Sequence, residues 1–190
     1  MSLDKHYHGD LDHVGVGQVA KPLFQMQITL ATAADALAIA AVRVAAADRL
    51  TKDFGEGHWS SHTHDGAVMR DIRDSRVIIA KSGATIVGTL TLQNKKPWAI
   101  DVAYFTPVKK AIYLINMAVL PDRQRSGVGR ALLEHAVKVA REIPAAAIRL
   151  DAYDAPAGAG EFYRKCGYTA RGGKVYRGVP LLYFELMEQT

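Results

Sequence analysis

Hydrophobic and polar residues alternate with a period of two in FQMQITL, residues 24–30. This alternation predicts a half-buried strand, because neighbouring side chains of a strand point to opposite faces. The apolar face would consist of Phe24, Met26, Ile28 and Leu30. An alanine-rich run follows to about Leu50 and predicts a long helix, since alanine has the highest helix propensity. Thr32 and Asp35 form a capping signal at its start.

Further along the chain, the hydrophobic period changes repeatedly between values typical of strands and of helices. The remaining predicted elements are a short helix over 64–74, a hairpin over 76–93, a strand over 110–120, a helix from about Gly127, a strand over 147–153, a helix ending at Gly167 and a hairpin over 168–188. The order β-α-α-β-β-β-α-β-α-β-β predicts one α/β domain with a mixed sheet over residues 25–190. Residues 1–24 show no sustained period and are interpreted as an irregular N-terminal extension.

The composition is that of one globular domain able to bury a core, with 190 residues, 49% of them hydrophobic and 23% charged. No apolar run approaches the roughly 20 residues that cross a bilayer. Residues 1–24 also lack the apolar block of a secretory signal, so we expect a soluble, cytoplasmic protein. The single cysteine, Cys166, excludes a disulfide within the chain and a cysteine-cluster metal site.

Charge and histidine content leave the class of partner open. A net charge of +5 suits a polyanion such as nucleic acid, an anionic small molecule, or a mildly basic surface without a partner. No run of five like charges exists, so a nucleic-acid-binding stripe is not evident and nucleic acid is not the expected partner. His6, His8 and His13 lie in the irregular extension without a rigid element to fix ligand geometry, so we assign no metal.

The helix predicted from about Gly127 begins in a basic, glycine-containing stretch, RQRSGVGRALLEHAVKVA, residues 123–140. Its apolar residues recur every four positions, which predicts an amphipathic helix. The first N–H groups of a helix are unpaired and carry partial positive charge, so this end suits an anion such as a pyrophosphate. Gly127 and Gly129 would let the anion approach the backbone. Charged or neutral donors would come from Arg123, Arg125, Arg130 and Gln124. The alternative is a turn softened by glycines, with solvated arginines.

Two common phosphate motifs are absent, because GVGRAL lacks both the third small residue of a dinucleotide fingerprint and the Gly-Lys-Ser/Thr triplet of a P-loop. Instead, Gln124-x-x-Gly127-x-Gly129, between LINMAVLP and RALLEHA, resembles the acyl-CoA pyrophosphate motif of the GNAT superfamily of N-acetyltransferases. EFYRKCGY, residues 161–168, resembles the family's F-Y-x-x-x-G-F/Y segment. The resemblance covers roughly residues 25–190 and implies a single-domain, mixed but mostly antiparallel sheet flanked by helices.

The resemblance also implies where an acetyl-CoA cosubstrate binds. The strand before the motif would carry a bulge whose backbone at Met117 and Val119 pairs with the pantetheine arm, since a bulge frees backbone groups from the ladder. Gln124 would complete the motif beside the pyrophosphate. The backbone amides that would cradle the pyrophosphate are those of Arg125, Ser126, Gly127, Val128, Gly129 and Arg130.

Tyr163 occupies the family's tyrosine position, so the resemblance makes it the candidate acid that protonates the leaving thiolate. An unperturbed phenol, with a pKa near 10, is mostly protonated at neutral pH and can donate. The alternative is a tyrosine that packs its ring and transfers no proton. The family often has asparagine seven residues earlier, where this chain has Pro156. Asp154 or the nearby backbone would then take over that cofactor contact.

The sequence does not single out a general base for the amine. The candidates are Asp101, Asp151, Asp154, Glu185 and His58, and a chain of water molecules to solvent is an equal contender. By resemblance, the acceptor pocket would lie between residues 54–62 and the last hairpin. Its candidate lining is His58, Trp59, Tyr176 and Tyr183, whose aromatic rings could equally belong to the core.

The leading hypothesis is an N-acetyltransferase that moves the acetyl group of acetyl-CoA to a primary amine of a small molecule or peptide. Transfer would be direct, in a ternary complex. The alternative is a non-catalytic acyl-CoA-binding regulatory module, which Pro156 and the lack of an obvious base leave open. A homodimer formed through an edge or terminal strand is a further arrangement compatible with such folds.

Overall fold

The computed structural model describes residues 26–188, and every predicted element within them is present. The strands are β1 (Met26–Leu30), β2 (Arg76–Ser82), β3 (Thr85–Gln93), β4 (Ala111–Val119), β5 (Ala147–Tyr153), β6 (Thr169–Tyr176) and β7 (Val179–Met187). The α-helices are α1 (Ala36–Phe54), α2 (Asp65–Asp74), α3 (Val128–Glu142) and α4 (Gly160–Lys165). The predicted element order is therefore confirmed. The predicted extension, residues 1–24, lies outside the described residues.

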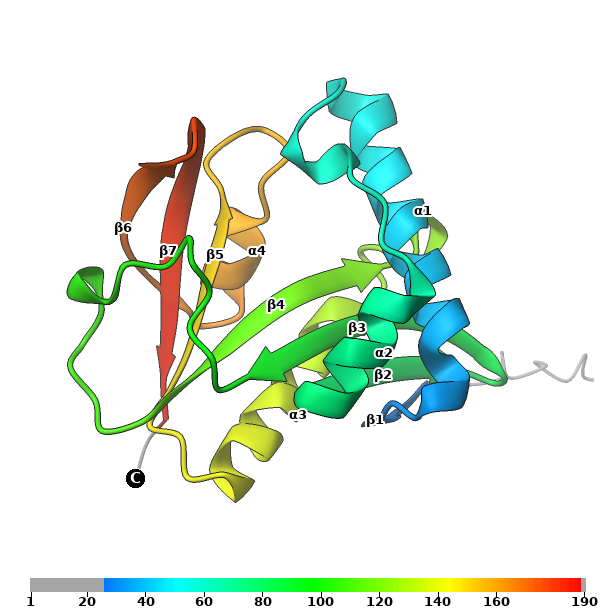
Figure 1. The fold of residues 1–190 in the computed structure, drawn as a ribbon, viewed down its shortest axis with the longest axis horizontal. Helices are drawn as coiled ribbons and strands as arrows, with labels where there is room; N and C mark the ends of the chain where they lie inside the picture. The colour runs from blue at the N-terminus through cyan, green and yellow to red at the C-terminus, as the bar shows by residue number, and fades with distance from the viewer. Residues whose placement is uncertain (1–25, 189–190) are drawn as a thin grey trace, which may run out of the picture.

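All seven strands form one sheet, in the order β1-β2-β3-β4-β5-β7-β6 (Figure 1). Every neighbouring pair is antiparallel except β4 and β5, which are parallel. A parallel pair needs a crossover connection, and α3 supplies it. The mixed, mostly antiparallel sheet flanked by helices is thus confirmed.

The parallel pair β4–β5 is short, and the two strands then separate. Only Ala111 to Tyr113 of β4 pair with β5, after which the backbones of the two strands diverge in the middle of the sheet (Figure 1). We call this divergence of the two backbones the opening. On its other edge, β4 pairs with β3 and carries a one-residue register shift, because Thr91 pairs with Ile115 whereas Thr89 pairs with Ala118. The bulge implied by the family resemblance is therefore present, and it lies beside the opening.

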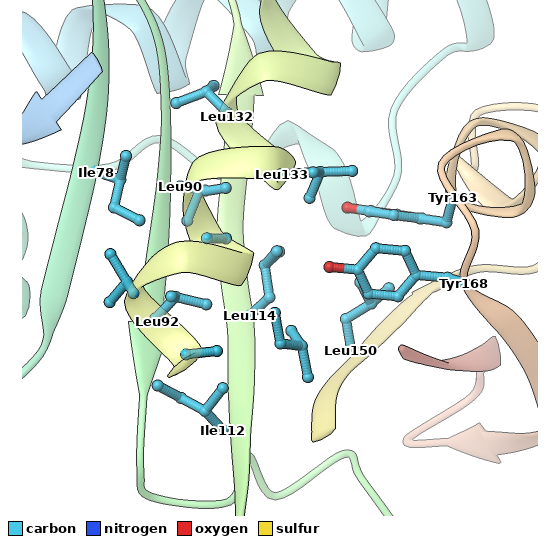
Figure 2. Packing of buried hydrophobic residues seen from close by; sticks show 14 of the residues in the cluster. Ile78, Leu90, Leu92, Ile112, Leu114, Leu132, Leu133, Leu150, Tyr163 and Tyr168 are labelled. Carbon is cyan, nitrogen blue, oxygen red and sulfur yellow. The ribbon is translucent and has the colours of Figure 1, made fainter. Parts of the chain in front are cut away.

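The two faces of the sheet have separate cores. The larger core lies beneath α3 and α4 and joins leucine and isoleucine side chains of β2 to β5 with Tyr163 and Tyr168 (Figure 2). The second core lies beneath α1 and α2, around Ile39, Val68 and Ile79. Because α3 packs on strands from both sides of the opening, apolar burial holds the two parts of the sheet together where hydrogen bonds do not.

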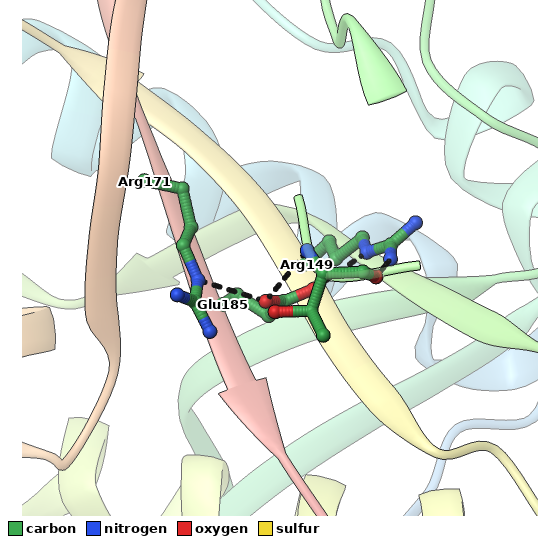
Figure 3. A network of polar contacts seen from close by, with 4 residues as sticks. Arg149, Arg171 and Glu185 are labelled. Carbon is green, nitrogen blue, oxygen red and sulfur yellow. Dashed lines mark hydrogen bonds and ion pairs between the residues drawn. The ribbon is translucent and has the colours of Figure 1, made fainter. Parts of the chain in front are cut away.

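A polar network fastens the connection between β3 and β4 to the C-terminal strands (Figure 3). Glu185 of β7 forms ion pairs with Arg149 of β5 at 3.0 Å and with Arg171 of β6 at 2.8 Å. It also accepts a hydrogen bond from the Thr106 amide, while Arg149 donates to the Thr106 carbonyl. The Glu185 side chain is completely buried, so these donors replace the water that a carboxylate needs.

Candidate functional site

The glycine-containing stretch forms the turn that leads into α3, as predicted. Gly127 precedes the first residue of the helix with φ of +93°, and no side chain caps it within the described residues. The first helical hydrogen bond runs from Ala131 to the Gly127 carbonyl, so the preceding amides have no partner within the helix. Five of the predicted binding residues are exposed here: Gln124, Arg125, Ser126, Gly127 and Arg130. The arrangement suits an anion at the helix N-terminus.

Glycine is favoured at the two positions of the motif for different structural reasons. An added Cβ at Gly127 would meet nothing within 4 Å, so its left-handed backbone, and not lack of space, favours glycine there. A Cβ at Gly129 would instead lie 3.0 Å from the Phe162 ring and 3.3 Å from the Met117 methyl group. Gly129 therefore allows α3 to pack closely on α4 and β4.

Hydrogen bonds stabilise the turn before α3 and leave most of its residues exposed. The Ser126 hydroxyl donates to the Arg123 carbonyl at 2.6 Å, and the Gln124 amide group donates to the Val119 carbonyl at 3.2 Å. Gln124 and Val119, both predicted to contact the cofactor, thus contact each other. Arg125 has φ of +60°, so the turn contains a second left-handed residue besides Gly127.

Tyr163 lies on α4 at the edge of the opening. Its hydroxyl is 3.6 Å from the sulfur of Met117, which follows Asn116 within the β4 bulge. Burial, followed by the nearby charges of Asp151 and Cys166, raises the pKa of the phenol. Tyr163 therefore stays protonated over the neutral range, as a proton donor must be, although the same shift makes the phenol a weaker acid.

The connection between β5 and α4 departs from the family pattern in a tight turn. The Gly158 amide donates to the Ala155 carbonyl at 2.8 Å, and a Cβ at Gly158 would overlap the Tyr153 carbonyl. Pro156 and Asp154 are both exposed on this turn. The Asp154 side chain forms no hydrogen bond or ion pair within residues 26–188, which leaves its predicted cofactor contact a prediction.

Two of the candidate bases, Glu185 and Asp101, have charged partners within the protein, and a third, His58, is exposed. Glu185 belongs to the buried network of Figure 3; burial alone would raise its pKa, but hydrogen bonds from Thr106 and Arg149 outweigh that effect and lower it. Asp101 pairs with Lys174 at 3.0 Å and accepts from the Ala103 amide, and these contacts lower its pKa. His58 is exposed on the connection between α1 and α2.

Asp151 differs from these candidates. It lies on β5 beyond the part that pairs with β4, opposite Tyr183 of β7 and therefore on the same face as that residue. Burial raises the pKa of its carboxyl, and no side chain of the described chain forms an ion pair or hydrogen bond with it. Tyr153, two residues further along β5, lies on the same face, and the charge of Asp151 raises the pKa values of both Tyr153 and Tyr163.

The residues predicted to line the acceptor pocket have different surroundings, and the pocket itself stays a prediction. The Trp59 ring meets Tyr153 edge-on at 5.5 Å, which connects the segment between α1 and α2 with the end of β5. Tyr183, in contrast, is fully buried between Tyr104 and Phe105 and donates to the Ala99 carbonyl. Tyr183 therefore belongs to the core, whereas Tyr153 lies on the same face of β5 as Asp151 and contacts Trp59.

Asn116 of the bulge and its partner Asp71 were not singled out from sequence. Asn116 is exposed and left-handed, with φ of +53°, and its side-chain amide donates to Asp71 of α2 at 3.2 Å. An asparagine inside the apolar run LINMAVL is the signal that could have identified it, because asparagine adopts this conformation more readily than other side chains.

A hollow of about 300 Å³ lies between the connection from β3 to β4 and strand β6, and it is lined in part by the candidate base Asp101 and by Tyr176. Its lining includes Trp98, which is 82% exposed, and the Asp101–Lys174 pair, but none of the predicted cofactor-binding residues. Over residues 26–188, no helix is long and apolar enough to cross a membrane, and no three metal-ligating side chains gather.

Comparison with known proteins agrees with the geometry. Residues 44–168 match the model of the acetyltransferase (GNAT) family. No match was found among curated proteins. Many solved structures share the fold, among them yncA of Salmonella typhimurium in complex with acetyl-CoA, with 17% identity, a TM-score of 0.64, and coverage of 85% of this chain and 93% of that one.

Two further structures are similar over comparable lengths. The Escherichia coli ribosomal-protein-S18-alanine N-acetyltransferase has 17% identity and a TM-score of 0.65, with 87% of this chain and 95% of that chain covered. The PaiA N-acetyltransferase of Thermoplasma acidophilum, in complex with coenzyme A, has 14% identity and a TM-score of 0.65, with 86% and 99% covered. At such identities the likeness establishes the fold.

Proposed function

The chain belongs to the GNAT family of acetyltransferases, whose acyl donor is acetyl-CoA, and from this premise we propose that it acetylates a primary amine of a small molecule or peptide. The observation that carries the proposal is one juxtaposition. The uncapped N-terminus of α3, the β4 bulge and the Tyr163 phenol adjoin one opening in the sheet, with Asp151 on its far side.

The donor would bind along β4. The amides of Arg125 to Arg130 would hold the pyrophosphate at the helix N-terminus, with Gln124 beside them. The pantetheine arm carries amide groups of its own, and the edge of β4 at Met117 and Val119, which β5 does not pair, offers it backbone partners; the Val119 carbonyl also accepts from Gln124. This path leads from the exposed turn to Tyr163, so the thioester would reach the opening.

Asp151 is our choice of general base among the candidates considered. It is a carboxylate in the opening without a cationic partner, and its raised pKa makes it a stronger base than an exposed aspartate. It would take the proton from the amine nitrogen as that atom attacks the thioester carbonyl. Tyr163 would protonate the sulfur as the C–S bond breaks, giving the amide and coenzyme A. The amine would enter beneath Trp59 and Tyr153.

Calorimetric titration with acetyl-CoA tests the donor site. Gly127→Glu adds bulk and negative charge where the pyrophosphate would lie, and should abolish binding measurable in the wild type. Gly83→Glu is the matched control, because Gly83 also has a positive φ with open space around its Cα. Equal binding by wild type and Gly127→Glu would contradict the proposed donor site.

Thiol release with a panel of small amines and peptides tests the reaction. Tyr163→Phe should bind acetyl-CoA as the wild type does but turn over about hundredfold more slowly, the lower part of the usual range for loss of a general acid. Unchanged turnover would remove Tyr163 from the acid role. Acetyl-CoA binding without thiol release for any amine would favour the alternative, a non-catalytic acyl-CoA-binding regulatory module, which the exposed Pro156 turn keeps in consideration.

A further inference from the structure

Three polar side chains from α1, α2 and β4 meet at the β4 bulge, and we call them the bulge clamp: Arg43, Asp71 and Asn116. One oxygen of Asp71, Oδ2, accepts hydrogen bonds from both partners, at 2.8 Å from Arg43 Nη1 and at 3.2 Å from Asn116 Nδ2. The bulge residue is therefore connected to both helices of that face through a single carboxylate.

Arg43 also reaches the strand on the other side of the bulge. Its Nη2 donates to the Thr91 hydroxyl at 3.0 Å, and Thr91 is the β3 residue at which the register shifts. The guanidinium is only 7% exposed, and its Nε has no hydrogen-bond partner in the described part of the chain. A buried donor without a partner costs stability, so stability alone does not account for this arginine.

Asn116 is held in an unfavourable backbone conformation. Its φ of +53° is left-handed, a region that most side chains disfavour and that asparagine adopts more readily than most, but still not as its preferred conformation. The residue is exposed, so packing does not impose this conformation, and the hydrogen bond to Asp71 is the contact that stabilises it. Strain of this kind at a site is a reason to look for a function.

Met117, the residue after Asn116, contacts both the start of α3 and the Tyr163 phenol. Met117 lies beside Gly129 at the start of α3, and its sulfur is 3.6 Å from the Tyr163 hydroxyl. A change in backbone direction at Asn116 would therefore move Met117 relative to both the phosphate-binding turn and the phenol.

We propose that Arg43 and Asp71 are positioning residues for the acyl donor, which act through Asn116 by holding the bulge so that the backbone after it meets the pantetheine arm. This inference rests on the proposed donor path along β4. It predicts that loss of the clamp affects the arm of acetyl-CoA and not its nucleotide end, because the nucleotide would bind at the turn before α3.

Asn116→Gly tests the bulge clamp without disturbing the rest of the fold. Glycine permits the left-handed backbone but removes the hydrogen bond to Asp71, and the Arg43–Asp71 ion pair stays intact. Calorimetry should show acetyl-CoA binding weakened about fivefold to tenfold, the fold-change that corresponds to one hydrogen bond of ordinary net strength. Affinity for adenosine 3′,5′-diphosphate, which lacks the arm, should remain within twofold of the wild type.

The control is Asn94→Gly, at an exposed asparagine between β3 and β4, which should change neither affinity. Asp71→Asn should show the same split between the two ligands, and Asp74→Asn, at an exposed aspartate of the same helix, should not. Thermal unfolding of each variant identifies the temperature at which it is folded, and the titrations are made below that temperature.

The outcomes separate this inference from the proposed function. Wild-type affinity for acetyl-CoA in Asn116→Gly, or equal weakening of acetyl-CoA and of the nucleotide, would overturn the positioning role while leaving the donor site in place. Absence of acetyl-CoA binding by the folded wild type would overturn the proposed function and, with it, this inference. Weakening confined to the ligand that carries the arm would support both.

Discussion

Two carboxylates on neighbouring strands of one sheet face, Asp151 on β5 and Glu185 on β7, have opposite surroundings. Glu185 is enclosed by Arg149, Arg171 and the Thr106 amide, and its pKa is lowered. Asp151 has no cationic partner among the described residues, and burial raises its pKa. A carboxylate whose hydrogen-bonding capacity is used by the protein fixes structure, whereas one whose capacity is unused can exchange a proton with a ligand.

The largest expected effect concerns Glu185. Glu185→Ala leaves two guanidinium groups without their carboxylate, and that of Arg149 is buried. Breaking a buried ion pair by removing one partner typically lowers the free energy of unfolding by about 3–5 kcal/mol. Urea denaturation measures the loss. Glu161→Ala, at an exposed i, i+3 pair on α4, is the control and should unfold as the wild type does. Wild-type stability in Glu185→Ala would break the comparison.

A smaller effect, and one on rate instead of stability, is expected at Asp151. If it is the general base, Asp151→Asn should reduce turnover about hundredfold, the lower part of the range for loss of such a group. Thiol release measures turnover, and calorimetry should give an unchanged affinity for acetyl-CoA. Asp74→Asn, at an exposed carboxylate of α2 to which no role is assigned, is the control. Equal rates in wild type and Asp151→Asn would show that Asp151 is not the general base, and a chain of water molecules would then be the candidate.

The smallest effect is the pH dependence of stability. The pKa of Asp151 is raised above its usual value of 3.8, so the folded state binds the proton more tightly than the unfolded state, and ionisation above the folded pKa destabilises the fold. Asp151→Asn should thus be more stable than the wild type at pH 7, and the difference should vanish below about pH 3.8, where the carboxyl is protonated in both states. Unfolding temperatures from pH 3 to 8 measure this.

Glu185 should show the opposite sign in the same measurements. The pKa of Glu185 is lowered, so its ionised carboxylate stabilises the folded state at pH values above the usual pKa of 4.5. This contribution is lost as the pH falls through the pKa of the folded state. Glu185→Gln should therefore be less stable than the wild type at pH 7 and approach it in acid. The same sign for both variants would show that the two environments do not differ as described.

The order of elements could be predicted because each depends on local patterns. The alternation in residues 24–30 predicted β1, and the four-residue period after Gly127 predicted α3. The different surroundings of Asp151 and Glu185 could not be predicted, because both are single acidic residues within apolar strands. The residues that distinguish them are distant in sequence, with Arg149 lying 36 positions before Glu185.

The motif itself was predictable, but parts of its packing were not. Gln124, Gly127 and Gly129 were identified from their spacing, and the turn forms as expected. The reason for Gly129 is the Phe162 ring, which belongs to α4 and approaches only in the folded chain. Asn116 and Asp71 are 45 positions apart, and no periodicity connects a bulge with a helix on one face of the sheet.

The short pairing between β4 and β5 has a thermodynamic consequence. Beyond Tyr113 the facing edge of β4 has no β5 partner, and backbone groups without a protein partner require hydration. A ligand arm with its own amides would exchange those hydrogen bonds almost one for one, so little net enthalpy would come from them. Release of ordered water into the bulk would then contribute a favourable entropy to binding, and this contribution would be set by how far the two strands diverge.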